Sequence, residues 1–180
     1  MPSRSSTDAY GSVAIGIHWL TAVLIIGLLA SGVLAEGAAD PATKATLLRL
    51  HAPMGISILV LTLLRIVWWW RFDTKPLPLG GNPAWQDMLA KAVHVLLYIV
   101  MIGMAASGIG MFVLSGAGDI LFGGAPGPLP DFDNFVPRVP HGIGAKLMLA
   151  LLALHIGAAL FHHFVRRDAT LGRMWSASSK

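Results

Sequence analysis

The stretch from Val139 to Phe164, VPHGIGAKLMLALLALHIGAALFHHF, decides the fold because it is long, apolar and carries two widely spaced histidines. His141 and His155 are fourteen residues apart, and on an α-helix that spacing is a rise of about 21 Å with a rotation of only about 40°. The two imidazoles therefore share one helix face at two depths. Metal-ligating side chains are costly inside a membrane, so the pair predicts two stacked metal centres.

The composition places this stretch in a membrane protein. The chain has 180 residues, 55% of them hydrophobic and 12% charged, with a mean hydropathy of +0.68. Its apolar runs lack the alternation of a transmembrane barrel, so the spans should be helices. We expect an all-α, integral membrane four-helix bundle forming one domain over residues 1–180. The expected spans are about 13–35, 47–70, 88–114 and 142–165, with an outer loop at 115–140.

The distribution of charge predicts the orientation. Nine of the thirteen basic residues fall in the two tails, the second connection and the end of the second span, so that side should be cytoplasmic, with both termini inside. The other side carries most of the acidic residues. The first apolar stretch is long and has no clear cleavage site, so it is expected to be a true span and not a signal peptide.

The sequence pI of about 9.9 does not indicate a nucleic-acid partner, because the cations follow membrane topology and no nucleic-acid module is readable. There is no cysteine, which excludes a structural disulfide and the thioether attachment of a c-type haem. We see no second domain and no convincing fixed-period repeat.

Sorting the histidines by expected depth gives two pairs. His18 and His155 should lie toward the cytoplasmic side, and His51 and His141 toward the outer side. Each pair joins two different spans, as a planar cofactor with one axial imidazole on each side requires. Zinc would need three or four ligands per site, whereas two axial histidines leave four equatorial positions for a porphyrin. The pattern predicts two non-covalent b-type haems working in outer-sphere electron transfer.

Arg65 and the glycines allow two interpretations each. Arg65 is fourteen residues after His51, so it shares that helix face one cofactor depth further in. Its guanidinium could pair with haem propionates or extend to the headgroups beside three tryptophans. The glycines around the histidines and in the third span could make room for a ring or let helices approach one another.

The segments GIHWLTAVLI, LRLHAPMGISILVLTLLR, VPHGIGAKLMLALLALHIGAALFHHF and RRDATLGRMW together resemble the prokaryotic cytochrome b561 family. That resemblance covers nearly the whole chain and implies a multi-pass protein of the bacterial inner membrane that binds two b haems and exchanges electrons with ubiquinone. It implies axial roles for His18 with His155 and for His51 with His141. The family is similar to the cytochrome b subunits of hydrogenases and formate dehydrogenases, and some members oxidise superoxide at the outer face.

The remaining histidines are candidates for other roles. His94 could replace an inner ligand or donate to a propionate, and His162 lies seven residues after His155, near the same helix face. His162, His94 and Trp19 are the candidates for a quinone site, which needs hydrogen-bonding groups beside an apolar slot. His163 is interpreted as a helix cap or headgroup contact. No catalytic residue can be assigned.

Three hypotheses about function follow. The first is a self-standing di-haem oxidoreductase that couples quinone to an outer electron donor such as superoxide. The second is an electron-transfer anchor that binds a catalytic subunit of a larger dehydrogenase or hydrogenase. The third is a haem-free structural or transport bundle. Lipid and quinone are expected partners under the first two hypotheses, and a protein partner or a second copy of the chain is open.

Overall fold

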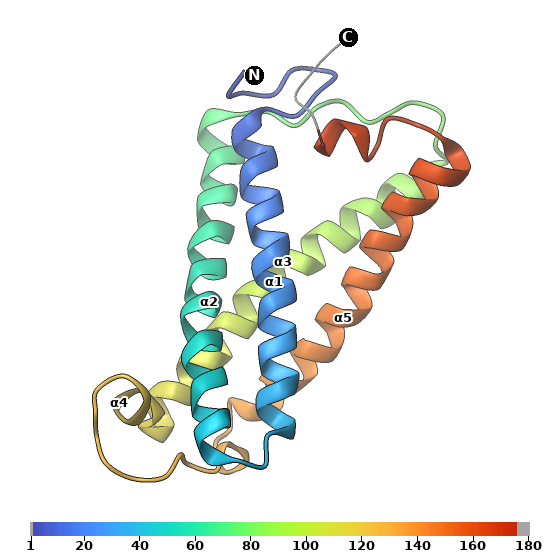
Figure 1. Ribbon diagram of the computed structural model, residues 1–180. Coiled ribbons are helices and arrows are strands. Elements are labelled where there is room, and N and C mark those ends of the chain that lie inside the picture. Colours follow the sequence, from blue (N-terminus) through green and yellow to red (C-terminus); the bar gives the residue numbers. More distant parts are fainter. Residues whose placement is uncertain (1, 176–180) are drawn as a thin grey trace. The chain divides into compact units, whose positions relative to one another are not determined.

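Four long helices dominate the computed structural model, which describes residues 2–175, and no strand occurs within that range (Figure 1). All four are long and apolar enough to cross a membrane, with mean hydropathies between 1.9 and 2.3 in their most apolar windows. This confirms the predicted all-α membrane class. The helices are α1 (Ser12–Gly37), α2 (Pro41–Val67), α3 (Ala84–Ser115) and α5 (Arg138–Phe161).

Two of these helices end in a wider turn. α2 continues into a π-helical turn over Trp68–Phe72, and α5 continues into another over His162–Arg166. Each expected span lies within one of the four long helices, once α2 and α5 are taken together with these turns. The additional residues lie at the ends of the helices, where the sequence is more polar.

The start of α2 shows how local chemistry sets a helix boundary. Asp40 precedes the helix, and its carboxylate accepts hydrogen bonds from the amide and the hydroxyl of Thr43, at 2.9 Å and 2.6 Å. These bonds lower the pKa of Asp40, the hydroxyl contact having the larger effect. Pro41 follows at the first helical position, where a missing N–H costs nothing. The helix therefore begins directly after the turn that follows α1.

The chain divides into two compact units. Unit 1 comprises Met1–Thr21, Leu61–Ile99 and Met148–Lys180, and unit 2 comprises Ala22–Val60 and Val100–Leu147. Each unit contains a section of all four long helices. The histidines divide between them, with His51 and His141 in unit 2 and the other five in unit 1.

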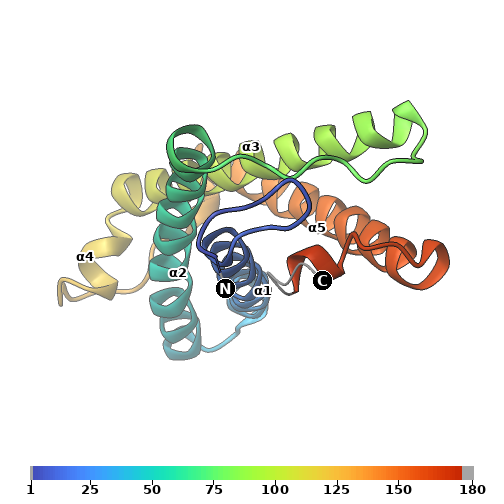
Figure 2. The ribbon, with the colours of Figure 1, turned by 90° about the horizontal axis from the view of Figure 1, so that it is seen from above.

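In unit 1, three segments outside the long helices are tied together. Figure 2 shows the N-terminal segment beside the connection that precedes α3, and the amide of Leu77 donates to the carbonyl of Thr7 at 2.9 Å. Arg173 in the C-terminal tail donates to three backbone carbonyls, those of Asp8 at 2.6 Å, Leu77 at 2.9 Å and Thr7 at 3.2 Å. One guanidinium therefore ties the C-terminal tail to the N-terminal segment and to the connection before α3.

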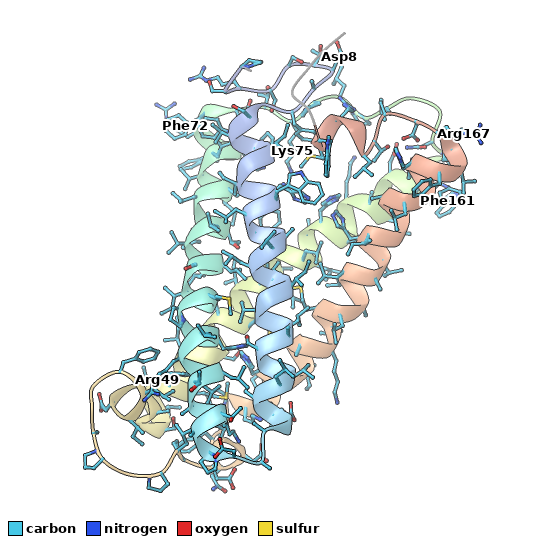
Figure 3. All side chains as sticks on the ribbon, in the orientation of Figure 1. Asp8, Arg49, Phe72, Lys75, Phe161 and Arg167 are labelled. Atoms are coloured by element: carbon cyan, nitrogen blue, oxygen red, sulfur yellow. The ribbon has the colours of Figure 1, made fainter. Side chains whose placement is uncertain are left out.

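In unit 2, the expected outer loop has some regular structure. Gly116 adopts a left-handed conformation with φ of 69° and starts the short helix α4 (Ala117–Leu121). Arg49 on α2 donates from Nε to the Leu121 carbonyl at 2.8 Å, and Figure 3 shows its side chain beside α4. Arg138 at the start of α5 pairs with Glu36 at 2.9 Å and with Asp133, in the loop, at 3.1 Å.

The buried residues include small side chains as well as larger apolar ones, whereas many large apolar side chains are exposed. Ala14 and Thr62 are 0% and 2% exposed, while Val23 and Val113 are 64% and 73% exposed. Such an outward apolar surface is unfavourable in water and suits contact with lipid. Small interior residues also allow helices to come close to one another and to a flat ring.

Candidate functional site

Unit 2 brings His51 and His141 together. His51 lies on α2 and His141 on α5, and their ring centroids are 6.2 Å apart with the ring planes at 63°. Both rings are partly buried. The two histidines that the sequence paired by depth therefore face each other from separate helices.

Each of these rings is held by a serine from a third or fourth helix. Ser31 on α1 lies 3.1 Å from Nδ1 of His51, and Ser107 on α3 lies 3.0 Å from Nδ1 of His141. Beside each serine is a glycine whose missing side chain leaves room for the ring. A Cβ on Gly32 would lie 3.1 Å from Cε1 of His51, and one on Gly108 would lie 3.3 Å from Cε1 of His141.

Unit 1 brings His18 and His155 together in the same way. His18 lies on α1 and His155 on α5, with ring centroids 6.1 Å apart and planes at 63°. His94 on α3 is also close, since its centroid is 5.2 Å from that of His155. The Nδ1 of His94 donates to the Ala90 carbonyl at 2.6 Å, because a carbonyl can only accept.

The spacing within both pairs fits a metal held between two imidazoles. A metal–imidazole bond is about 2 Å long, so two rings on opposite sides of one metal have centroids about 6 Å apart. The values of 6.2 Å and 6.1 Å match this spacing, whereas the His94–His155 separation of 5.2 Å is shorter. Among residues 2–175 there is no group of three or more His, Asp or Glu side chains that could hold a bare metal ion.

Arg65 is the charged group beside the unit 1 pair. Its Nη1 lies 3.1 Å from Nδ1 of His18, and its Nε is buried without a hydrogen-bond partner among the described residues. A guanidinium only donates, so Nδ1 of His18 accepts in this arrangement. A partly buried cation with a buried, unpartnered donor suits an anionic ligand group such as a carboxylate.

The end of α5 holds a second polar cluster in unit 1. Nδ1 of His162 lies 2.5 Å from Oδ2 of Asp168, and Thr170 donates its amide to Oδ1 of the same carboxylate at 2.9 Å. Arg167 adopts a left-handed conformation, with φ of 53° and ψ of 39°, and so turns the chain back toward the helix. Burial raises the pKa of Asp168, but bonds from Thr170 and His162 outweigh this and lower it to about 2.

The other candidates lie nearby in unit 1. Trp19 donates its indole N–H to the Met174 carbonyl at 2.7 Å, and its ring contacts those of His18 and Trp175. The indole nitrogen of Trp19 therefore already has a hydrogen-bond partner within the chain. His163 is exposed, and its ring packs against Phe164 with centroids 4.7 Å apart.

The sequence did not point to Ser31 or Asp168. A signal for the serine was nevertheless present, because the tripeptide Ala-Ser-Gly occurs at 30–32 and again at 106–108, once in each of two spans. Asp168 gave no such signal, since only the left-handed turn at Arg167 brings it to His162.

The fold and the paired histidines define a helical membrane protein of the cytochrome b class. A family model described as "Prokaryotic cytochrome b561" matches residues 9–177. The chain belongs to this family, which confirms the resemblance seen in its motifs, and membership implies haem b as the cofactor.

Curated relatives match the chain over nearly its whole length. It is 32% identical to a "Probable superoxide oxidase CybB" from Yersinia pestis, over 92% of this chain and 94% of the relative. It is 28% identical to "Cytochrome b561 homolog 1" from Escherichia coli, over 93% of this chain and 97% of the relative. It is 29% identical to a "Cytochrome b562" from Cereibacter sphaeroides, over 92% of this chain and 94% of the relative.

Proposed function

We propose that this chain is a di-haem membrane oxidoreductase that transfers electrons between an outer donor and the quinone pool. The observation that carries the proposal is the presence of one histidine pair in each unit, with ring centroids 6.2 Å and 6.1 Å apart. His51 and His141 are the proposed axial ligands of one haem, and His18 and His155 those of the other. Haem b held by two imidazoles supplies one-electron transfer without an open coordination position.

Arg65 is proposed to hold a propionate in unit 1. For His18 to bind a metal through Nε2, its Nδ1 must carry the proton, and this N–H would then face the donors of Arg65. The guanidinium is expected to turn from the histidine toward a carboxylate. Its unpartnered Nε supports this role, because a propionate would satisfy it.

The quinone site is proposed to lie in unit 1, with His162 as its hydrogen-bonding and proton-exchanging residue. Asp168 fixes Nδ1 of His162, which leaves Nε2 as the free end of the ring. His94 presents its Nε2 in the same way, since its Nδ1 is bonded to Ala90. Trp19 contributes an apolar wall, because its N–H is bonded to Met174.

The proposed electron donor at unit 2 is superoxide, a substrate named for the relative from Yersinia pestis. Unit 2 holds four basic side chains beside five acidic ones, so steering of an anion would come from individual cations and not from the net charge of the unit. Two of them are engaged, Arg49 with the Leu121 carbonyl and Arg138 with Glu36 and Asp133. The others are Lys44 and Lys146. The charge distribution supports placing unit 2 at the outer side of a bacterial inner membrane, with both termini cytoplasmic.

The number and ligation of the haems can be tested directly. A pyridine haemochrome assay on the purified protein should give two haems per chain. His51→Ala and His141→Ala should each remove the same component of the reduced-minus-oxidised spectrum, and His18→Ala and His155→Ala the other. His94→Ala should leave both components in place. If His94→Ala removes a component that His155→Ala leaves intact, the unit 1 assignment is wrong.

The reaction requires a separate test. Purified protein in vesicles with ubiquinone should consume enzymatically generated superoxide and reduce the quinone without another subunit. His162→Ala should raise KM for quinone at unchanged haem content, while the exposed neighbour His163→Ala should not. Activity that appears only after a stable partner protein is added would favour the alternative, an anchor subunit of a larger dehydrogenase or hydrogenase.

A further inference from the structure

The two histidines of unit 2 are held by matched surroundings that come from two different helices. On α1, Ser31 donates to the Leu28 carbonyl at 3.1 Å and contacts Nδ1 of His51 at 3.1 Å. The Leu28 carbonyl also shares a hydrogen bond with the His51 ring. One serine and the carbonyl three residues before it therefore face the same ring.

The arrangement on α3 repeats this one. Ser107 donates to the Met104 carbonyl at 3.0 Å and contacts Nδ1 of His141 at 3.0 Å. The Met104 carbonyl lies 3.1 Å from the same nitrogen. The glycine that follows each serine leaves room for the edge of the ring.

These contacts determine which ring nitrogen carries the proton. The single hydroxyl hydrogen of each serine is donated to a carbonyl, so Ser31 accepts from Nδ1 of His51 and Ser107 accepts from Nδ1 of His141. The Met104 carbonyl, which can only accept, lies against the same nitrogen of His141. His51 and His141 must therefore carry a proton on Nδ1, which leaves the lone pair of Nε2 available for a metal. Hydrogen bonding of the other ring nitrogen fixes the orientation of a metal-bound histidine and raises its basicity.

We propose that Ser31 and Ser107 are positioning residues that hold the two unit 2 histidines ready for metal binding and lower the redox potential of that centre. The proposal rests on ligation by His51 and His141. A more basic ligand stabilises the oxidised metal. In unit 1, the Arg65 guanidinium lies beside His18, and it would stay near that centre after turning toward a propionate, so its positive charge stabilises the reduced state. The unit 2 component is therefore the lower in potential of the two.

The test is a spectroelectrochemical titration of the purified full-length protein and its variants, combined with the haemochrome assay. Ser31→Ala and Ser107→Ala should raise the midpoint potential of the component that His51→Ala removes, and the double variant should raise it further. A tenfold change in the oxidised-to-reduced ratio corresponds to 59 mV for one electron, and we expect up to that change for each serine. The other component should not move.

Ser57→Ala is the matched control. Ser57 lies on the same helix as His51 and in the same unit, but its hydroxyl donates to the Pro53 carbonyl at 2.9 Å. The control should leave both potentials unchanged. If Ser31→Ala lowers the occupancy of the unit 2 component, the proposal is equally supported, since the unheld ring then fails to bind.

Several outcomes would overturn the proposal. These are unchanged potential and occupancy in the double variant, equal shifts in both components, or a wild-type unit 2 component that is the higher in potential. Failure of the ligation itself looks different, because His51→Ala would then remove no spectral component. The two failures are therefore separable in one set of variants.

Discussion

Replacing Asp168 with asparagine should loosen the end of α5 by a predictable amount. Asp168 has its pKa lowered from 3.8 to about 2, and each pKa unit corresponds to about 1.4 kcal/mol, so the carboxylate contributes at most about 2.5 kcal/mol near neutral pH. Its side chain is 25% exposed, and solvent screening reduces the expected value to about 1 kcal/mol.

The pH dependence follows from the direction of the shift. A carboxyl group whose pKa is lower in the folded state stabilises that state above its unfolded pKa. The stabilisation from Asp168 should therefore be complete above about pH 4 to 5 and lost as the pH falls through 3.8 toward 2. Asp168→Asn should weaken the turn at pH 7 and have almost no effect at pH 2.

Hydrogen exchange at Thr170 is the local assay, because its amide donates to the Asp168 carboxylate at 2.9 Å. A loss of about 1 kcal/mol should speed its exchange about fivefold at pH 7, and the upper limit of about 2.5 kcal/mol would give about seventyfold. Arg167→Asn is the control, since it removes an exposed charge (Figure 3) at a left-handed position that asparagine tolerates. Unchanged exchange in Asp168→Asn would refute the reasoning.

Three further predictions concern arginines. Arg65→Gln should lower the midpoint potential of the unit 1 component, because a cation beside His18 is lost; an unchanged or raised potential in spectroelectrochemistry would contradict this. Arg173→Lys should weaken the docking of the C-terminal tail by about 1–3 kcal/mol, because a lysine ammonium cannot donate to all three carbonyls at once. Faster limited proteolysis of the tail would show this loss. Arg138→Gln should change thermal stability by less than about 1 kcal/mol, because its partners Glu36 and Asp133 are 70% and 78% exposed; a larger loss in detergent would count against the estimate.

The features that could be predicted from the sequence are those that a single helix shows by itself, in its length, its hydropathy and the spacing of its residues. Four apolar runs of spanning length and the motifs around the histidines led to the all-α membrane class and to the cytochrome b561 family, and both are confirmed. The fourteen-residue spacing of His141 and His155 predicted a shared face. The haem ligands, the quinone site and the orientation of the termini stay predictions.

What the sequence could not reveal depends on contacts between helices. Ser31 is an ordinary small residue of a membrane helix until the fold places it against His51, twenty residues further along the chain. Asp168 follows the last helix as one polar residue among several, and its pairing with His162 depends on one left-handed residue. Neither contact follows from hydropathy or from helical periodicity.

The three carbonyls bound by Arg173 have a consequence for engineering the chain. All three acceptors are main-chain atoms, so exchanging the side chains of Thr7, Asp8 or Leu77 leaves the acceptors in place. Correlated substitutions between Arg173 and these three positions would therefore not reveal the contacts. Deleting the residues before α1 would remove two of its three acceptors and loosen a tail that is 165 residues away along the chain. A shortened N-terminus should thus be checked first at the opposite end of the polypeptide.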